Sequence, residues 1–235
     1  NVAATNLALE LGTKRLRSFY ETLGFGKKTG IELPGELSGT VKFNYESELA
    51  NASFGQGVTT TPVQMLQALT TIANEGVMIQ PYIVDKIVDE AGNVIKQNGR
   101  TEINTVASKE TINKIRDLMY KMVYDGFETS KLYAPSNVSL IGKTGTAQIA
   151  SPAGGYLTGE YDYIKSFAGL FPYEDPQYII YFSVKQLIGG TQEITETVSN
   201  VVEEVAVYLA KRAELLRERG VGVEKIILDP GIGFA

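Results

Sequence analysis

The chain has 235 residues and a formal net charge of −5, with 43% hydrophobic and 21% charged residues, a balance typical of a globular domain with a sizeable core. It has no cysteine and no histidine, which excludes disulfides, thiolate or imidazole metal ligands and Ser-His-Asp triads; we expect no metal and no cofactor. No block of Lys and Arg offsets the acidity, so a nucleic-acid partner is not expected.

Helical spacing of apolar residues dominates the first half of the chain. It predicts helices over residues 2–24, interrupted at Gly12. A glycine-bounded loop over 52–57 leads to Thr61-Pro62, a helix N-cap followed by proline in the first turn, and that helix should run to Ala73. Two strands, 82–88 and 94–96, are predicted to form a hairpin.

The second half begins with a helix that Ser108 should cap and that runs to Val123. The pattern then changes to strands rich in β-branched and aromatic residues over 138–149, 163–172 and 178–186, which predicts an antiparallel meander. A long helix over 193–219 and a strand over 225–228 follow. Helices followed by an antiparallel sheet that a helix closes indicate an α+β fold.

One motif in the first meander strand carries candidate chemistry, Gly142-Lys143-Thr144-Gly145-Thr146. A lysine within a sheet strand suggests a charge that faces a cleft. We expect Lys143 and the hydroxyls of Thr144 and Thr146 to share one edge or face, while Gly145 lets a ligand approach the backbone. The pattern predicts an anion-binding site.

This motif has two other interpretations. A phosphate-binding P-loop needs a glycine five residues before Gly142 and a helix after the motif. Asn137 occupies that position and the sequence continues as a strand, so the P-loop does not fit. The simplest alternative is a surface strand with a solvated lysine.

Several further segments occur in an order that resembles the C-terminal half of the transpeptidase domain of class B penicillin-binding proteins, over about residues 1–209. Asn1-Val2-Ala3 resembles the end of that family's Ser-x-Asn motif, and Lys143-Thr144-Gly145-Thr146-Ala147-Gln148 resembles its Lys-Thr-Gly strand. The other matching segments are 30–36, 52–57, 61–65, 72–77, Pro81 and 166–172.

The resemblance implies a β-lactamase/transpeptidase-like α+β fold, a five-stranded antiparallel sheet flanked by helices, here without its N-terminal half. It implies that Lys143 supplies positive potential and that Thr144 and Thr146 bind the carboxylate of a stem peptide or β-lactam beside Gly145. The Thr146 N–H would form half of an oxyanion hole, a contribution of about 3 kcal/mol. Asn1 would bind the substrate amide. Gln148 would line the cleft, although an outward-facing strand position is an equal alternative.

In that family a serine in a Ser-x-x-Lys motif attacks the penultimate D-alanine of a stem peptide, and an amine resolves the acyl-enzyme. No serine in this chain is followed by lysine at that spacing. We therefore expect the chain to be inactive alone and to need the missing N-terminal half of the domain. The start at Asn1 has no initiating Met and no basic region, so it is not a signal peptide.

The implied partners are peptidoglycan stem peptides, β-lactams and other cell-division or elongation proteins. The implied location is the extracytoplasmic face of the bacterial cytoplasmic membrane, with the anchor outside this chain. Alternatives of the same fold are a β-lactamase, a D,D-carboxypeptidase and a β-lactam sensor. A binding domain that kept only the cleft is a fourth possibility.

The tail, residues 210–235, is expected to be a separate helix-strand unit. Its segment 222–234 resembles part of dihydropteroate synthases, in which the position of Asp229 contacts the pterin ring. A (β/α)₈ barrel needs roughly 250 residues, so a working pterin site is not expected here. A chance match of a Gly- and Pro-rich turn after a strand is the alternative.

Overall fold

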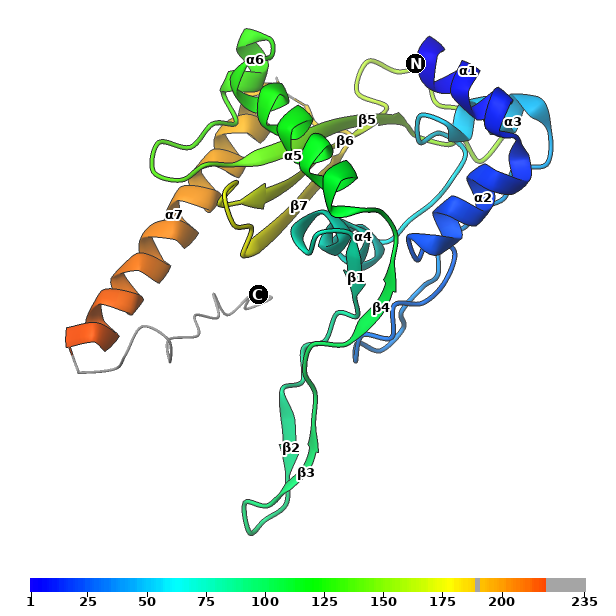
Figure 1. The fold of residues 1–235 in the computed structure, drawn as a ribbon. Coiled ribbons are helices and arrows are strands. Elements are labelled where there is room, and N and C mark those ends of the chain that lie inside the picture. The colour runs from blue at the N-terminus through cyan, green and yellow to red at the C-terminus, as the bar shows by residue number, and fades with distance from the viewer. Residues whose placement is uncertain (189–190, 219–235) are drawn as a thin grey trace.

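A computed structural model of the chain describes residues 1–188 and 191–218 (Figure 1). Two helices, α1 (Val2–Leu11) and α2 (Thr13–Thr22), open the chain. Gly12 separates them with a φ of 81°, a conformation that suits glycine, as the sequence predicted. Helix α3 (Glu46–Ala52) packs against α1, and Ala8, Phe43, Leu49 and Ala52 form their shared core.

Helix α4 (Pro62–Ala73) begins at the predicted cap. The Gln64 N–H donates to the Thr61 hydroxyl (3.2 Å), and the Thr61 N–H donates to Gln64 Oε1 (2.9 Å). At the other end of α4 the Arg116 guanidinium donates to the carbonyls of Ile72 and Ala73, each at 2.8 Å. Both ends of the helix therefore have side-chain partners for their backbone groups.

A ribbon of four short strands leaves the body of the molecule after α4 (Figure 1). β1 (Val77–Ile79) pairs with β4 (Glu102–Thr105), and β2 (Lys86–Val88) pairs with β3 (Val94–Gln97). Every residue of β2 and β3 is exposed. Glu32 ties the base of the β2–β3 hairpin to the loop after α2, because it accepts from the Ile83 N–H (3.1 Å) and from the Asn98 amide (2.5 Å).

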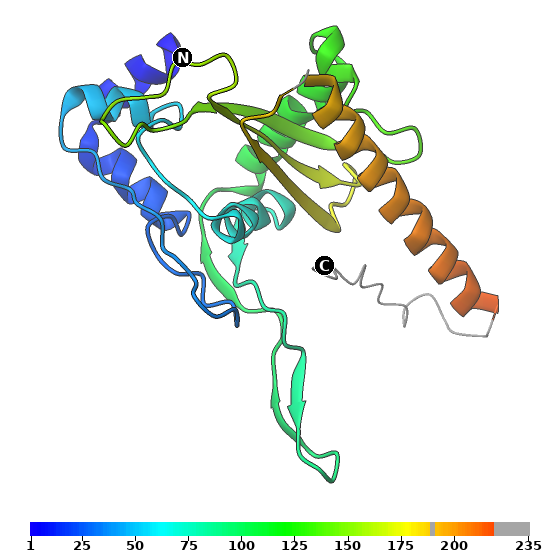
Figure 2. The same ribbon diagram turned by 180° about the vertical axis from the view of Figure 1, so that it is seen from behind.

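The ribbon returns to α5 (Lys109–Tyr124), which Ser108 caps as predicted, and the short α6 (Glu128–Lys131). The sheet follows as β5 (Ile141–Gln148), β6 (Tyr163–Phe171) and β7 (Tyr178–Lys185), an antiparallel meander in the order β5-β6-β7. Helix α7 (Thr191–Glu218) crosses one side of this sheet (Figure 2).

Two apolar cores hold the sheet in place. Phe167 of β6 packs with Val198 and Val202 of α7 on one face, and all three are fully buried. Ile141 and Leu170 pack with Leu69 of α4 and Met119 of α5 on the other face. The helices cover the sheet at the start of β5 and leave the end of β5 accessible.

The fold class expected from sequence, α+β with an antiparallel sheet flanked by helices, is confirmed. Four elements were not predicted, α3, α6, β1 and β4. The strand expected over 82–88 begins only at Lys86, because Asp85 and the residues before it lie in the loop at the hairpin base. Within the described residues the sheet has three strands, whereas the resemblance implied five. The strand expected over 225–228 lies outside the described residues.

Candidate functional site

Strand β5 carries five of the six candidate site residues, Lys143, Thr144, Gly145, Thr146 and Gln148. Lys143, Thr146 and Gln148 are exposed, and Thr144 and Gly145 are partly buried. Among the described strands β5 pairs only with β6, so it forms an edge of the sheet. An edge strand presents backbone N–H and C=O groups that an extended ligand can bind.

The two faces of β5 carry different chemistry, since successive residues of a strand point to opposite sides. Thr144, Thr146 and Gln148 lie on one side, which we call the hydroxyl face. Lys143, Gly145 and Ala147 lie on the other, the groove face. Lys143 and the two hydroxyls therefore share the edge strand of the sheet but not one of its faces. The Lys143 Nζ donates to the carbonyl of Thr144 at 2.7 Å.

Glycine at position 145 has a local steric reason. Ser166 of β6 lies directly opposite Gly145 in the register. A Cβ on residue 145 would lie 2.6 Å from Ser166 Oγ, well inside the normal contact distance. The absence of a side chain therefore lets the two strands and the Ser166 hydroxyl meet at the groove face, and it also leaves the β5 backbone open there.

A groove of about 490 Å³ adjoins this part of the sheet. The N-terminal segments and α4 form one wall of this groove, and strands β5, β6 and β7 form the other. From the N-terminal half of the chain the side chains that line it are mostly apolar: Tyr20, Phe25, Val41, Phe54, Val58, Pro62 and Met65. From the sheet it is lined by Gly145, Thr146, Ala147, Ile164, Ser166, Tyr181 and Ser183.

Tyr20 lines this groove and also packs against the core between α1 and α3. Its hydroxyl donates to the Ala52 carbonyl at 2.5 Å. Burial raises the pKa of Tyr20 above its ordinary value of 10.0. Tyr20 is therefore a neutral, engaged donor near neutral pH and not a ready general base.

Asn1, the sixth candidate, does not belong to β5. It is exposed, stands at the N-terminal end of α1 and makes no side-chain cap, although its carbonyl accepts from the Thr5 N–H at 2.9 Å. It is not one of the residues that line the groove. Its expected role at the substrate amide stays a prediction.

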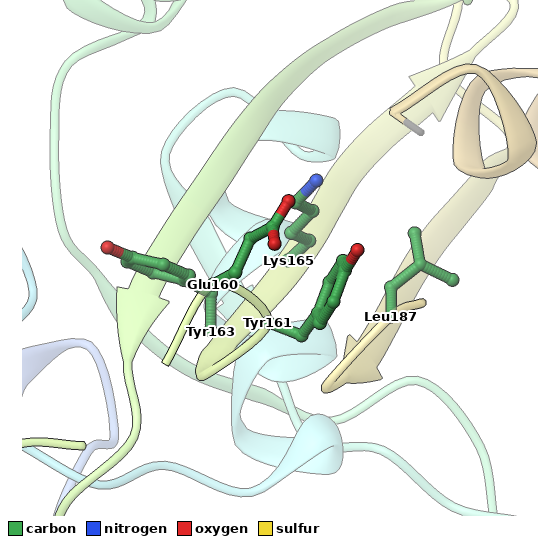
Figure 3. A pocket seen from close by; sticks show the side chains of 5 residues that line it. All are labelled: Glu160, Tyr161, Tyr163, Lys165 and Leu187. Carbon is green, nitrogen blue, oxygen red and sulfur yellow. The ribbon is translucent and has the colours of Figure 1, made fainter. Parts of the chain in front are cut away.

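Sequence reasoning missed a second pocket, of about 160 Å³, that adjoins the hydroxyl face (Figure 3). Its lining residues are Glu160, Tyr161, Tyr163, Lys165 and Leu187. Lys165 lies opposite Thr146 in the register, and Tyr163 lies opposite Gln148. The predicted meander pairs these two strands, but the register that sets Lys165 opposite Thr146 has no local signal in the sequence.

Two general features complete the description of residues 1–188 and 191–218. No group of three or more acidic side chains gathers there as a metal site. None of the helices in this part of the chain combines the length and apolar character needed to cross a membrane.

Comparison with known proteins identifies a family profile, the penicillin binding protein transpeptidase domain, that matches residues 1–202. Stage V sporulation protein D of Bacillus subtilis is 34% identical over 197 residues, which cover 82% of this chain and 30% of that protein. The chain thus spans about a third or less of the length of the first curated relatives it matches.

Solved structures agree in fold. Penicillin Binding Protein 2X from Streptococcus thermophilus superposes with a TM-score of 0.80 at 30% identity, over 87% of this chain and 31% of that one. Penicillin binding protein 3 of Mycobacterium tuberculosis, complexed with aztreonam, superposes with a TM-score of 0.77 at 26% identity, over 90% of this chain and 49% of that one.

A second profile, pterin binding enzyme, matches residues 177–235. The match supports the resemblance seen in the tail, but it begins one residue before β7 and overlaps the transpeptidase match up to residue 202. Asp229 and its neighbours lie outside the described residues. The boundary expected at 209/210 stays a prediction.

Proposed function

Since this chain belongs to the penicillin binding protein transpeptidase family, we propose that it forms the substrate-binding wall of a peptidoglycan D,D-transpeptidase. The enzyme cross-links stem peptides by serine acyl transfer, and β-lactams acylate the same serine. The observation that carries this proposal is the edge strand β5, with its two accessible hydroxyls and its open backbone beside a groove.

The proposal gives a role to each of the five candidate residues of β5. Thr144 and Thr146 donate hydrogen bonds from their hydroxyls to the carboxylate of the acyl donor. The N–H of Thr146 is one donor to the oxyanion of the tetrahedral intermediate. Lys143, held near the strand edge by its hydrogen bond to the Thr144 carbonyl, supplies positive potential to the serine's proton network. Gly145 lets the ligand approach, and Gln148 borders the site.

The attacking serine and its general base come from a Ser-x-x-Lys segment, which this chain does not contain. We propose that such a segment binds in the groove, which is mostly apolar. Tyr20, Phe54 and Met65 line one side of the groove, and Gly145 lies on the other. We use "the complete transpeptidase" for the protein that joins this chain to that segment. The proposal places it on the extracytoplasmic face of the cytoplasmic membrane, with other cell-division or elongation proteins as partners.

Labelling with a fluorescent penicillin tests this function. The complete transpeptidase is expected to form a covalent adduct that survives denaturation and that excess unlabelled penicillin prevents. The isolated chain of residues 1–235 is expected to form none, because removal of the nucleophile abolishes the acyl-enzyme. Labelling of the isolated chain, or failure of the complete protein to label, would contradict the proposal.

Product analysis separates the transpeptidase from the alternatives with the same fold. A transpeptidase transfers the acyl group to an added amine acceptor, whereas a D,D-carboxypeptidase or a β-lactamase transfers it mainly to water. A sensor holds the β-lactam without turnover of a peptide. Mass spectrometry of a D-Ala-D-Ala donor incubated with and without a D-amino acid acceptor distinguishes these outcomes.

Pterin binding is a second candidate, favoured only by the profile match over residues 177–235. That segment is far shorter than the roughly 250 residues of a (β/α)₈ barrel. We expect no binding when a pterin is titrated into the protein and its fluorescence is followed. Saturable quenching would reverse that expectation.

A further inference from the structure

Lys165 stands at a position that no part of the proposed transpeptidase site yet uses. It pairs directly with Thr146 across the β5–β6 ladder, and Gln148 pairs with Tyr163 in the same way. Residues directly opposite each other in an antiparallel pair project from the same face, with Cβ atoms about 5 Å apart. The hydroxyl face therefore carries one lysine from β6, while the lysine of β5 itself is on the groove face.

The Lys165 side chain is long enough to reach an anion that the Thr144 and Thr146 hydroxyls bind. Thr144 is the diagonal neighbour of Lys165, at roughly 7–8 Å between Cα atoms. A lysine stem has four methylenes and three donors at its end. An ammonium on this stem can contact an anion held between the Thr144 and Thr146 hydroxyls without any movement of the backbone. Lys165 is also partly buried, so its charge is less screened by water than that of a fully exposed lysine.

Lys165 lines a small pocket together with acidic and aromatic side chains. Glu160, Tyr161 and Tyr163 line the same 160 Å³ as Lys165 (Figure 3). Lys165 is not a free cation, because it already takes part in an interaction within the protein. The Glu160 carboxylate lines the same pocket, so it would compete with a ligand carboxylate for the Lys165 ammonium.

We propose that Lys165 is a specificity-determining residue that selects acyl donors and β-lactams with a free carboxylate, by placing its ammonium at the anion that Thr144 and Thr146 bind. The proposal rests on the proposed function and adds the residue that provides the charge. Lys143 acts differently, on the serine's proton network, and contributes to reaction with charged and uncharged ligands alike.

The test compares a penicillin with its methyl ester in the complete transpeptidase. The quantity measured is the ratio of second-order acylation rates, acid over ester. Lys165→Gln is expected to lower this ratio about ten-fold, in line with loss of a charge-assisted hydrogen bond. Lys165→Arg should restore most of the ratio. The matched control is Lys185→Gln, an exposed lysine of the same sheet that pairs with Ile164 and therefore projects from the groove face.

A second variant keeps the proposal testable if Lys165→Gln does not fold. Glu160→Gln removes the competing carboxylate and is expected to raise the acid-over-ester ratio. An unchanged or lower ratio in this variant would contradict the proposal, as would a wild-type ratio in Lys165→Gln. If the wild-type protein reacts with neither ligand, the proposed function fails. If it reacts and these variants keep its selectivity, only the role of Lys165 fails.

Discussion

Gly145 and Ser166 face each other across the β5–β6 ladder so closely that a Cβ on residue 145 would lie 2.6 Å from Ser166 Oγ. Gly145→Ala should therefore destabilise the complete transpeptidase modestly, by about 0.5–1.5 kcal/mol, because the new methyl group would push the Ser166 side chain off its present rotamer. Urea unfolding measures this difference.

A double-mutant cycle identifies the cause of that cost. Ser166→Ala removes the hydroxyl that the new methyl group would meet, so Gly145→Ala should cost clearly less in that background. Additive effects of the two changes would show that the Ser166 hydroxyl is not the obstacle.

The Thr146 hydroxyl is expected to contribute directly to ligand binding. Thr146→Val keeps the shape and the β-branch of the side chain but removes the donor, and should lower penicillin acylation of the complete transpeptidase roughly ten-fold. Stopped-flow acylation measures the effect. Thr101→Val, an exposed threonine outside the site, is the control. A Thr146→Val rate within two-fold of wild type would remove the hydroxyl from the proposed site.

Gln64 holds three segments together from a fully buried position. Its amide donates to the carbonyls of Lys27 (2.6 Å) and Ser38 (2.7 Å), while its oxygen accepts from Thr61 N–H. Gln64→Leu removes the side-chain partner of these three partly buried backbone groups at once and should cost about 3 kcal/mol in unfolding free energy. The exposed Gln177→Leu is the control, and an equal loss in both variants would contradict this role.

Stability should also depend on Glu36 in acid. Burial acts to raise the pKa of its carboxyl, but donors on Thr29 and Gly30 outweigh that effect and hold the pKa below the ordinary 4.5. Because the folded pKa is the lower one, this stabilisation is present above the unfolded pKa and is lost as pH falls through the folded value.

Glu36→Gln should thus lower the unfolding midpoint near neutral pH, and its difference from wild type should shrink as the pH drops below about 4.5. Urea titrations at several pH values measure the difference. A constant gap from neutral to acid pH would show that the charge of Glu36 has no part in it.

The isolated chain is expected to be a poor independent folding unit. Helix α1 exposes large apolar side chains, with Val2 77% and Leu7 66% accessible, and the groove is lined by further apolar groups. Such surfaces favour association and weaken cooperative unfolding. Calorimetry of residues 1–235 should give a broad transition at low temperature. A sharp monomeric transition would refute this expectation.

Local signals made part of this structure predictable. Thr61-Pro62 and Ser108 fixed the starts of α4 and α5 because a cap acts on the backbone within three residues of itself. Helix α3 escaped prediction because it follows Tyr45, which is not a usual cap residue. β1 and β4 are three and four residues long and pair across more than twenty intervening residues, so neither has a local signature.

The candidate site was also predictable only in part, where a local motif contains its residues. The order of the motif residues identifies the candidate positions of β5, whereas the alternation of the strand sets Lys143 and Thr144 on opposite sides. Lys165 had no signal of its own, because its relation to Thr146 exists only through the register of two strands joined by a long loop. Residues that a motif contains were accessible to sequence reasoning, and residues that a register supplies were not.

The β2–β3 hairpin offers a practical handle on the molecule. All of its strand residues are exposed, its turn is closed by the Asn93 and Gly92 N–H groups on Asp89, and Glu32 fastens its base. Figure 1 shows it projecting away from the sheet that carries the site. A fluorophore or an affinity peptide placed at this turn would report on the protein, or tether it to a surface, at a distance from β5.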